Sequence, residues 1–207
     1  MNSNRSNKEN IEDLSPIGSQ LGPLLLLAGI FFLSFISRIM FAPLMPTIEH
    51  DLGIGHAEAG SLFLLISAGY FVSLLGAGFL SSRLTHRRTI VFSAISVGIT
   101  LIGVSLCHGA WSIRLGLFTL GLTAGTYLPS GIATLTSLIS SKDWGKGVAI
   151  HEFAPNLGFV AAPLMSEALL TWFSWREILS FLGKLFSYPP SCLHSGLSQI
   201  VPSISIT

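Results

Sequence analysis

The stretch LGPLLLLAGIFFLSFISRIMFAPLMP, residues 21–46, decides the fold class of this chain. Its only charged residue is Arg38. It is long enough to cross a hydrocarbon layer about 30 Å thick, because a helix rises about 1.5 Å per residue. Four further apolar blocks follow at 59–80, 89–107, 112–139 and 147–172. Because the blocks are continuous and do not alternate, the sequence predicts an all-α membrane protein with five complete transmembrane helices.

The composition agrees with this class and argues against others. Of the 207 residues, 50% are hydrophobic and 10% are charged, and the formal net charge is +1. No basic patch of the kind that binds nucleic acid is present, so nucleic-acid binding is not expected. Cys107 and Cys192 lack the spacing of metal ligands, so we expect no bound metal or cofactor. No nucleophile lies beside a base, so we do not expect the protein to be an enzyme.

Lysine and arginine are distributed unevenly among the connections. Seven of them fall on one side of the predicted membrane: Arg5, Lys8, Arg83, Arg87, Arg88, Lys142 and Lys146. The connection 47–58 has neither residue type and carries three acids. Since cytoplasmic loops carry the excess of basic residues, the tail 1–20 is predicted to be cytoplasmic, in a bacterial inner or plasma membrane.

The sixth apolar segment, WREILSFLG at 175–183, is short. Lys184, Pro189 and Pro190 follow it, and a proline in a helix interior costs about 3 kcal/mol. We therefore expect an incomplete sixth helix. The stretch 184–207 is interpreted as an atypical tail produced by truncation or a frameshift, with a genuine short tail as the alternative.

Small residues recur along two of the predicted helices. They are Gly69, Ser73, Gly76 and Ala77 in the second and Gly116, Gly121 and Gly125 in the fourth. Helices in lipid pack through close backbone approach at such residues, although glycine is also simply common in membrane helices.

The connection between the second and third blocks reads GFLSSRLTHRRTI, residues 78–90. It resembles the signature loop of the major facilitator superfamily, G-x-L-a-D-r-x-G-r-k. Ser82 stands where the family has Asp, which puts the usual ion pair in doubt, and Thr85 stands where it has the second Gly. In the family this loop takes part in gating, so the resemblance implies a gating loop that contains Gly78, Arg83, Arg87 and Arg88. An ordinary basic loop on the cytoplasmic side would explain the presence of the arginines, but not their spacing after Gly78.

Two later blocks are similar to the fourth and fifth helices of the same family. The first has Arg114, Gly121, Gly125 and Pro129, the second has Ala154, Pro155, Gly158 and Pro163, and WRE follows at 175–177. The resemblance covers residues 21–183 and implies an amino-terminal helical bundle of a transporter. In such transporters two six-helix halves rock around a central site, so a second half or a second copy is the expected partner.

Arg38 is the candidate substrate-binding residue. Charges at membrane depth are costly and usually face a cavity or a partner. Pro46 follows eight residues later, and this spacing is similar to the first helix of the superfamily's organic-anion and sugar-phosphate transporters, where the arginine binds the acidic group of the substrate. A guanidinium suits that task because it stays charged and donates in parallel pairs. Pairing with an acid in the bundle and snorkelling to the interface remain alternatives.

His151 and Glu152 lie near the cytoplasmic start of the fifth block. A zinc-hydrolase motif is excluded because Pro155 stands where its second histidine belongs. A carboxylate beside an imidazole can bind or relay a proton, which makes the pair a candidate for coupling to a proton or counter-ion. Alternatively, Glu152 pairs with Arg87 or Arg88 and only stabilises one state.

The sequence thus predicts secondary transport of a small organic solute, with an anion favoured by Arg38, by alternating access through the lipid bilayer. The alternatives are a membrane interaction or sensory subunit that does not transport, and an inactive fragment.

Overall fold

The computed structural model describes residues 20–187 except residue 84, and for residues 78–83 it describes the backbone alone. The described chain folds into helices and contains no strand, so the all-α prediction is confirmed. The helices are α2 (Leu21–Ile39), α3 (Phe41–Leu52), α4 (His56–Arg83), α5 (His86–Ser105), α6 (Ala110–Gly125), α7 (Tyr127–Leu138), the 3₁₀ turn η1 (Ser141–Asp143), α8 (Trp144–Leu170) and α9 (Trp175–Ser187). The predicted cytoplasmic tail, apart from Gln20, and the atypical tail beyond Ser187 lie outside the described residues.

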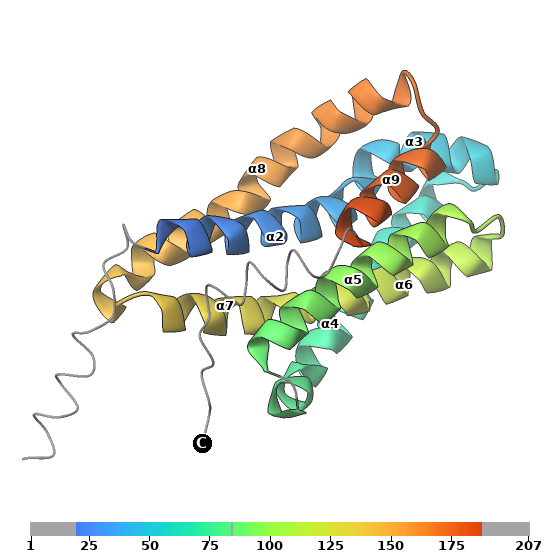
Figure 1. The fold of residues 1–207 in the computed structure, drawn as a ribbon. Coiled ribbons are helices and arrows are strands. Elements are labelled where there is room, and N and C mark those ends of the chain that lie inside the picture. The colour runs from blue at the N-terminus through green and yellow to red at the C-terminus, as the bar shows by residue number, and fades with distance from the viewer. Residues whose placement is uncertain (1–19, 84, 188–207) are drawn as a thin grey trace, which may run out of the picture.

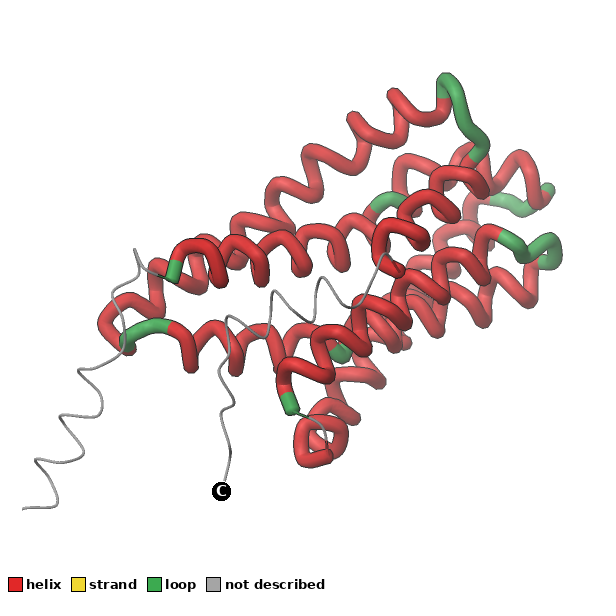
Figure 2. Tube along the Cα trace, viewed as in Figure 1, coloured by secondary structure: helices red, strands yellow, loops and turns green. Residues whose placement is uncertain are grey.

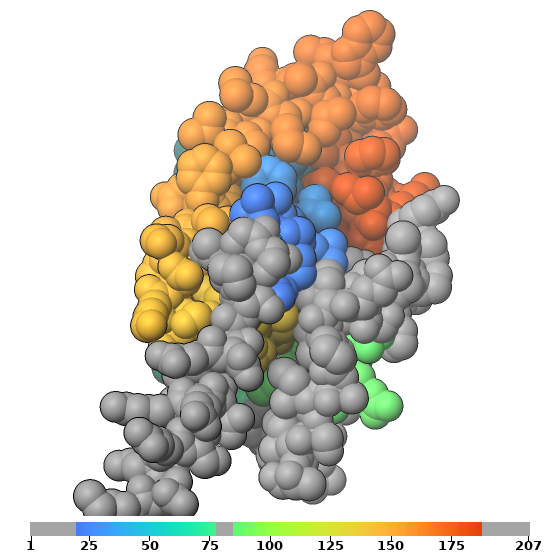
Figure 3. All heavy atoms as spheres, turned by 60° about the vertical axis from the view of Figure 1, so that its left-hand side comes forward, coloured from blue at the N-terminus to red at the C-terminus, as the bar shows by residue number. Residues whose placement is uncertain are grey.

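Successive spans run up and down in one bundle (Figure 1). The connections at 53–55, 106–109 and 171–174 gather at one end, which we call the acidic end (Figure 2). The start of α5 and the connection at 139–143 belong to the opposite end, which we call the basic end because Arg87, Arg88, Lys142 and Lys146 lie in or beside them. Figure 3 shows a face of the bundle on which α8 lies beside α2.

Within the described residues, four segments are long and apolar enough to cross a membrane: Leu21–Leu52, His56–Ala77, His86–Ser105 and Ser141–Leu170. The block at 112–139, predicted as one continuous helix, is instead divided into α6 and α7 at Thr126. Pro129 is consistent with the division, because it has no N–H to donate to the carbonyl of Gly125 and lies in the first turn of α7, where that N–H is not needed.

The first span also differs from the expected helix at 21–46. It is divided into α2 and α3 at Met40, and Pro43 in the first turn of α3 again lacks a donor for the carbonyl four residues earlier. The helix then continues to Leu52, six residues beyond the predicted end. Gly53 ends it with a φ of 63°, a left-handed conformation that glycine adopts without steric cost.

The sixth helix, α9, continues to Ser187, beyond its predicted end at residue 183. Packing against α5 explains the extra turn. A Cβ on Gly183 would lie 2.7 Å from the carbonyl oxygen of Gly98, and a Cβ on Gly98 would lie 2.7 Å from that of Gly183. The two backbones therefore touch, and Phe186 is buried in the same interface.

Close backbone approach also joins α4 to α6. A Cβ on Gly69 would collide with the carbonyl oxygen of Phe118, and one on Gly121 would collide with that of Ile66. Backbone atoms cannot move aside as a flexible side chain does. Gly76, in contrast, has nothing within 4 Å of such a Cβ among the described residues. Small-residue packing is therefore confirmed at Gly69 and Gly121, whereas Gly76 makes no such contact with the described residues.

Ion pairs hold the acidic end together. Arg176 of α9 pairs with Asp51 of α3 and also donates to the carbonyl of Cys107 at 3.2 Å. The indole of Trp175 donates to the same carboxylate at 3.3 Å. Arg114 of α6 pairs with Glu58 of α4. The arginines at the starts of α6 and α9 therefore each have an acidic partner on a different helix.

We expect Arg176→Gln to lower the free energy of unfolding of the bundle by about 1 kcal/mol in total. This is more than we expect for Asp51→Asn, because the arginine also binds the carbonyl of Cys107. Detergent-induced unfolding followed by circular dichroism measures both. Lys146→Gln is the matched control, since its pair with Asp143 is solvent-exposed and lies within one turn. Equal effects of all three substitutions would contradict the view that Arg176 holds the acidic end together.

Candidate functional site

Arg38 lies near the middle of the first membrane segment, close to the division between α2 and α3. Its guanidinium carbon is 4.4 Å from the ring centroid of Tyr70 on α4 and 5.5 Å from that of Phe35 on its own helix. A cation within about 6 Å of an aromatic face is attracted by the ring quadrupole. The two rings therefore hold the guanidinium between α2 and α4.

The donors of Arg38 are incompletely used. Its Nε is buried and has no hydrogen-bond partner, and none of the ion pairs between described residues includes this arginine. A guanidinium offers five N–H donors. The alternative of pairing with an acid in the bundle thus finds no partner in the part of the chain that the structure describes, and the side chain has donors for an external acidic group.

His151 belongs to a group of three parallel rings in which Phe31 is the nearest ring to both His151 and Tyr127. Its side chain is fully buried, with the ring of Phe31 at 4.4 Å and that of Tyr127 at 6.0 Å between centroids. The planes are within about 11° of parallel. These rings come from α2, α7 and α8, so the imidazole fixes how three helices meet.

Hydrogen bonds connect the stacked rings to Glu152. The hydroxyl of Tyr127 donates to the carbonyl of Leu27 at 2.9 Å and contacts Nε2 of His151 at 3.2 Å. On the other side of the imidazole, Nδ1 lies 3.3 Å from Oε1 of Glu152. The carboxylate side chain is 47% exposed, whereas the imidazole is buried. The pair therefore connects a buried group to one that reaches the surface.

Glu152 and Arg38 face a common neighbour. The hydroxyl of Tyr70 is close enough to both side chains to feel their charges, and Glu152 acts on the hydroxyl of Tyr127 in the same way. The predicted substrate residue on α2 thus contacts this tyrosine of α4 directly, whereas the predicted proton residues on α8 are linked to it through the charge of Glu152. We call Arg38, Tyr70, Tyr127, His151 and Glu152 the polar cluster.

The predicted gating loop lies apart from the polar cluster, at the basic end. Arg87 and Arg88 occupy the first turn of α5. Gly78 and Arg83 belong to the last part of α4, for which the structure describes the backbone alone. The side chain of Arg83 therefore lies outside the described part of the chain. Among the side chains that the structure describes, Glu152 forms an ion pair with His151.

Sequence reasoning missed the two tyrosines of the polar cluster. Each interrupts an apolar stretch, Tyr70 in SAGYF and Tyr127 in AGTYL. A hydroxyl at membrane depth has no water to bond and needs a partner in the protein. That requirement is a usable signal, although it does not say which helix supplies the partner.

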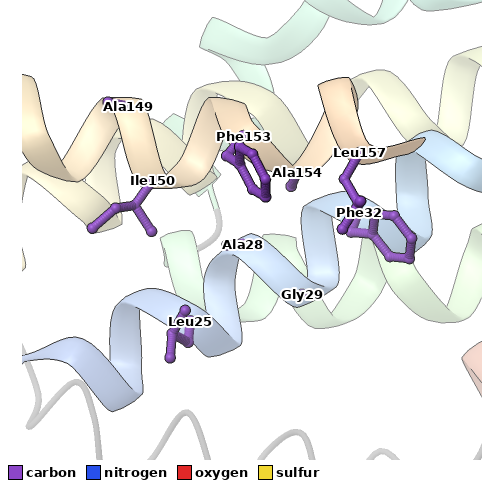
Figure 4. Close-up of a pocket in the computed structure, with 9 residues that line it drawn as sticks. All are labelled: Leu25, Ala28, Gly29, Phe32, Ala149, Ile150, Phe153, Ala154 and Leu157. Carbon is purple, nitrogen blue, oxygen red and sulfur yellow. The ribbon is translucent and has the colours of Figure 1, made fainter. Parts of the chain in front are cut away.

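An apolar groove of about 510 Å³ runs between α2 and α8 (Figure 4). It is lined by Leu25, Ala28, Gly29, Phe32, Ala149, Ile150, Phe153, Ala154 and Leu157. None of these residues carries a charge, so the groove does not recognise an anion. Within the described residues, no group of three histidine, cysteine or acidic side chains is placed to hold a metal ion.

Comparison with known proteins identifies the family. The family model of the Major Facilitator Superfamily matches residues 27–186, from α2 almost to the end of α9. The chain belongs to the Major Facilitator Superfamily. It is accordingly an integral membrane protein of a transporter family, and the helical bundle described above is the superfamily's fold.

Similar proteins include two curated superfamily relatives. A "Protein TsgA homolog" of Buchnera aphidicola subsp. Acyrthosiphon pisum (strain Tuc7) is 22% identical over 149 residues, which cover 69% of this chain and 38% of that protein. A "Probable 4-methylmuconolactone transporter" of Cupriavidus pinatubonensis is 27% identical over 143 residues, which cover 66% of this chain and 33% of that protein.

The fold also matches the solved structure of a transporter. The crystal structure of a POT family transporter in complex with a thioalcohol-conjugated peptide superposes with a TM-score of 0.67 at 18% identity, over 86% of this chain and 37% of that chain. The chain thus spans between 33% and 38% of the length of these proteins.

Proposed function

We propose that this chain forms the amino-terminal half of a secondary transporter that carries a small organic anion by alternating access, without enzymatic chemistry. Membership of the superfamily supports transport as the general activity. The chain spans about a third of its relatives, so a second half, or a second copy, completes the central site.

The observation that supports an anionic solute is the environment of Arg38. The charge sits at mid-membrane depth, Tyr70 and Phe35 hold the guanidinium plane, and Nε has no partner among the described residues. A charge retained at this depth without an internal partner is costly unless a ligand uses it. A carboxylate or phosphate matches the parallel donors of a guanidinium.

The proposed coupling site is the pair His151 and Glu152, which binds a proton near the arginine. The charges of Arg38 and Glu152 both act on the hydroxyl of Tyr70, so a solute that neutralises Arg38 changes the electrostatic balance at that hydroxyl. Opening and closing of the basic end is assigned to the loop that contains Gly78, Arg83, Arg87 and Arg88. A bound counter-ion at the same pair would serve the same purpose.

The proposed orientation places the basic end, and with it the amino terminus, in the cytoplasm of a bacterial plasma membrane. Lys142, Lys146, Arg87 and Arg88 flank the connections at that end. Basic residues near an anionic leaflet are each stabilised by about 1 kcal/mol.

Uptake into proteoliposomes tests the proposal. 4-Methylmuconolactone, named for one relative, carries a carboxyl group and serves as the acid probe; its methyl ester is the matched neutral probe. The chain is reconstituted alone and together with the second half of a full-length relative. Accumulation of the acid probe over the ester in either preparation supports anion transport, and the preparation that works shows whether a second half or a second copy is required.

The opposite results are equally clear. The full-length relative is assayed under the same conditions. If it accumulates the acid probe and neither preparation of this chain accumulates either probe, transport by this chain is contradicted. Equal uptake of acid and ester would retain transport and reject an anionic substrate. Empty liposomes correct for passive diffusion of the ester.

A further inference from the structure

The hydrogen bonds around Tyr127 have a fixed direction. The carbonyl of Leu27 can only accept, and it lies 2.9 Å from the hydroxyl of Tyr127. That hydroxyl carries one hydrogen. Once this hydrogen points to Leu27, the hydroxyl oxygen can only accept from its other neighbour, Nε2 of His151, at 3.2 Å. The imidazole must then carry a hydrogen on Nε2.

The reverse direction is unfavourable. If the hydroxyl of Tyr127 donated to His151, two oxygen atoms would face each other at 2.9 Å with no hydrogen between them. Both groups are buried, so no water is available to relieve the contact. The distances agree with the first direction, since a hydroxyl–carbonyl bond is ordinarily a little shorter than a bond from a ring N–H.

The fixed Nε2–H determines what Nδ1 can do toward Glu152. Either Nδ1 is also protonated and donates to a carboxylate, or it is bare and accepts from a protonated carboxyl. In both cases one hydrogen lies between the two residues. If that hydrogen leaves, a bare nitrogen faces a carboxylate at 3.3 Å, and the attraction becomes repulsion.

We infer that Tyr127 is a positioning residue that makes the position of Glu152 depend on a single proton. With the proton present, the carboxyl group is held against His151. Without it, the carboxylate is released from His151 toward the surface; the other titratable group that its charge acts on across the bundle is Tyr70 of α4, which contacts Arg38 of α2. The inference rests on the proposed coupling site and assigns it a residue from a third helix, α7.

The proton balance of this step involves water alone. The hydrogen shared by Nδ1 of His151 and Oε1 of Glu152 passes from the carboxyl group to water, because that side chain is 47% exposed while the imidazole is buried. No bond between heavy atoms forms or breaks. The hydrogens on Nε2 and on the hydroxyl of Tyr127 stay in place throughout.

Nitrogen NMR of the imidazole tests the inference in the full chain. The protein is labelled with ¹⁵N-histidine and reconstituted in lipid nanodiscs, and His151→Gln identifies the signal. At about pH 10, far above the usual histidine range near 6.5, wild-type His151 is expected in the Nε2–H form. A wild-type ring in the Nδ1–H form would overturn the inference, whatever any variant shows.

Tyr127→Phe removes the hydroxyl and keeps the ring stacked on Phe31. Nε2 then no longer needs a hydrogen, so the neutral ring can donate from Nδ1 to Glu152. We expect the ratio of Nδ1–H to Nε2–H to rise about fivefold, which corresponds to one hydrogen bond of about 1 kcal/mol. Tyr70→Phe is the matched control, because the ring nitrogens of His151 bond to Tyr127 and Glu152 and not to Tyr70, so this variant is expected to leave the ratio unchanged.

An unchanged ratio in a folded Tyr127→Phe protein, or an equal change in Tyr70→Phe, would overturn the inference. If Tyr127→Phe does not fold, the wild-type form at high pH decides alone. None of these spectra requires transport. A failed uptake assay therefore rejects the proposed function without altering the NMR result, and the reverse also holds.

Discussion

Replacement of Arg38 by glutamine is expected to weaken binding of the acid probe by about a hundredfold. Hydrogen bonds to charged groups contribute about 1.5 to 3 kcal/mol, and each 1.4 kcal/mol is a factor of ten in affinity. Glutamine removes both the charge and the paired donors of the guanidinium. Arg38→Lys keeps the charge but loses the planar donor pair, so we expect about a tenfold loss. Calorimetric titration of the chain in nanodiscs measures both.

Arg114→Gln is the matched control for this series. Arg114 is also an arginine near an aromatic ring, Trp111, but it pairs with Glu58 at the acidic end. Its loss is expected to reduce stability slightly and to leave affinity unchanged. Similar losses of affinity in the Arg38 and Arg114 variants would indicate a general effect of removing positive charge, and would contradict a specific site at Arg38.

The largest expected effect on stability comes from Gly69→Ala. The added methyl group would collide with the backbone carbonyl of Phe118, which can be relieved only by moving α4 away from α6. Overpacking of this kind costs about 1 to 3 kcal/mol. Unfolding in mixed micelles of increasing SDS content, followed by helix content, is expected to show a clearly lower midpoint for this variant.

Gly76→Ala, two turns along the same helix, provides the comparison. Nothing among the described residues lies within 4 Å of its new methyl group, and alanine favours helix over glycine by up to about 1 kcal/mol. We expect an unchanged or slightly raised midpoint. If both variants have the same unfolding midpoint in SDS content, close packing of α4 on α6 is not what holds the two helices together.

The helical class was predictable because the physical requirement is simple. A stretch such as residues 21–46 is too apolar and too long for a loop in water, and in lipid a helix satisfies its own backbone. The divisions at Met40 and Thr126 were not predicted. A proline breaks the hydrogen bond to the carbonyl four residues earlier, but whether the span then bends or starts a new helix depends on its neighbours.

The functional site was predictable only in part. A lone arginine in an apolar span is costly, so Arg38 could be singled out from sequence. Its contact with Tyr70, and that of His151 with Tyr127, join different helices, and the spacing along one chain does not reveal which helices meet. The extra turn of α9 was missed for the same reason, since it depends on Gly98 of α5.

The central claim is that Arg38 recognises the negative charge of the solute, and one binding measurement tests it directly. The acid probe and its methyl ester are each titrated into the wild-type chain and into Arg38→Gln. The account predicts that the wild type prefers the acid by about a hundredfold and that this preference disappears in the variant. The same preference for the acid in both proteins, or no preference in the wild type, would contradict it.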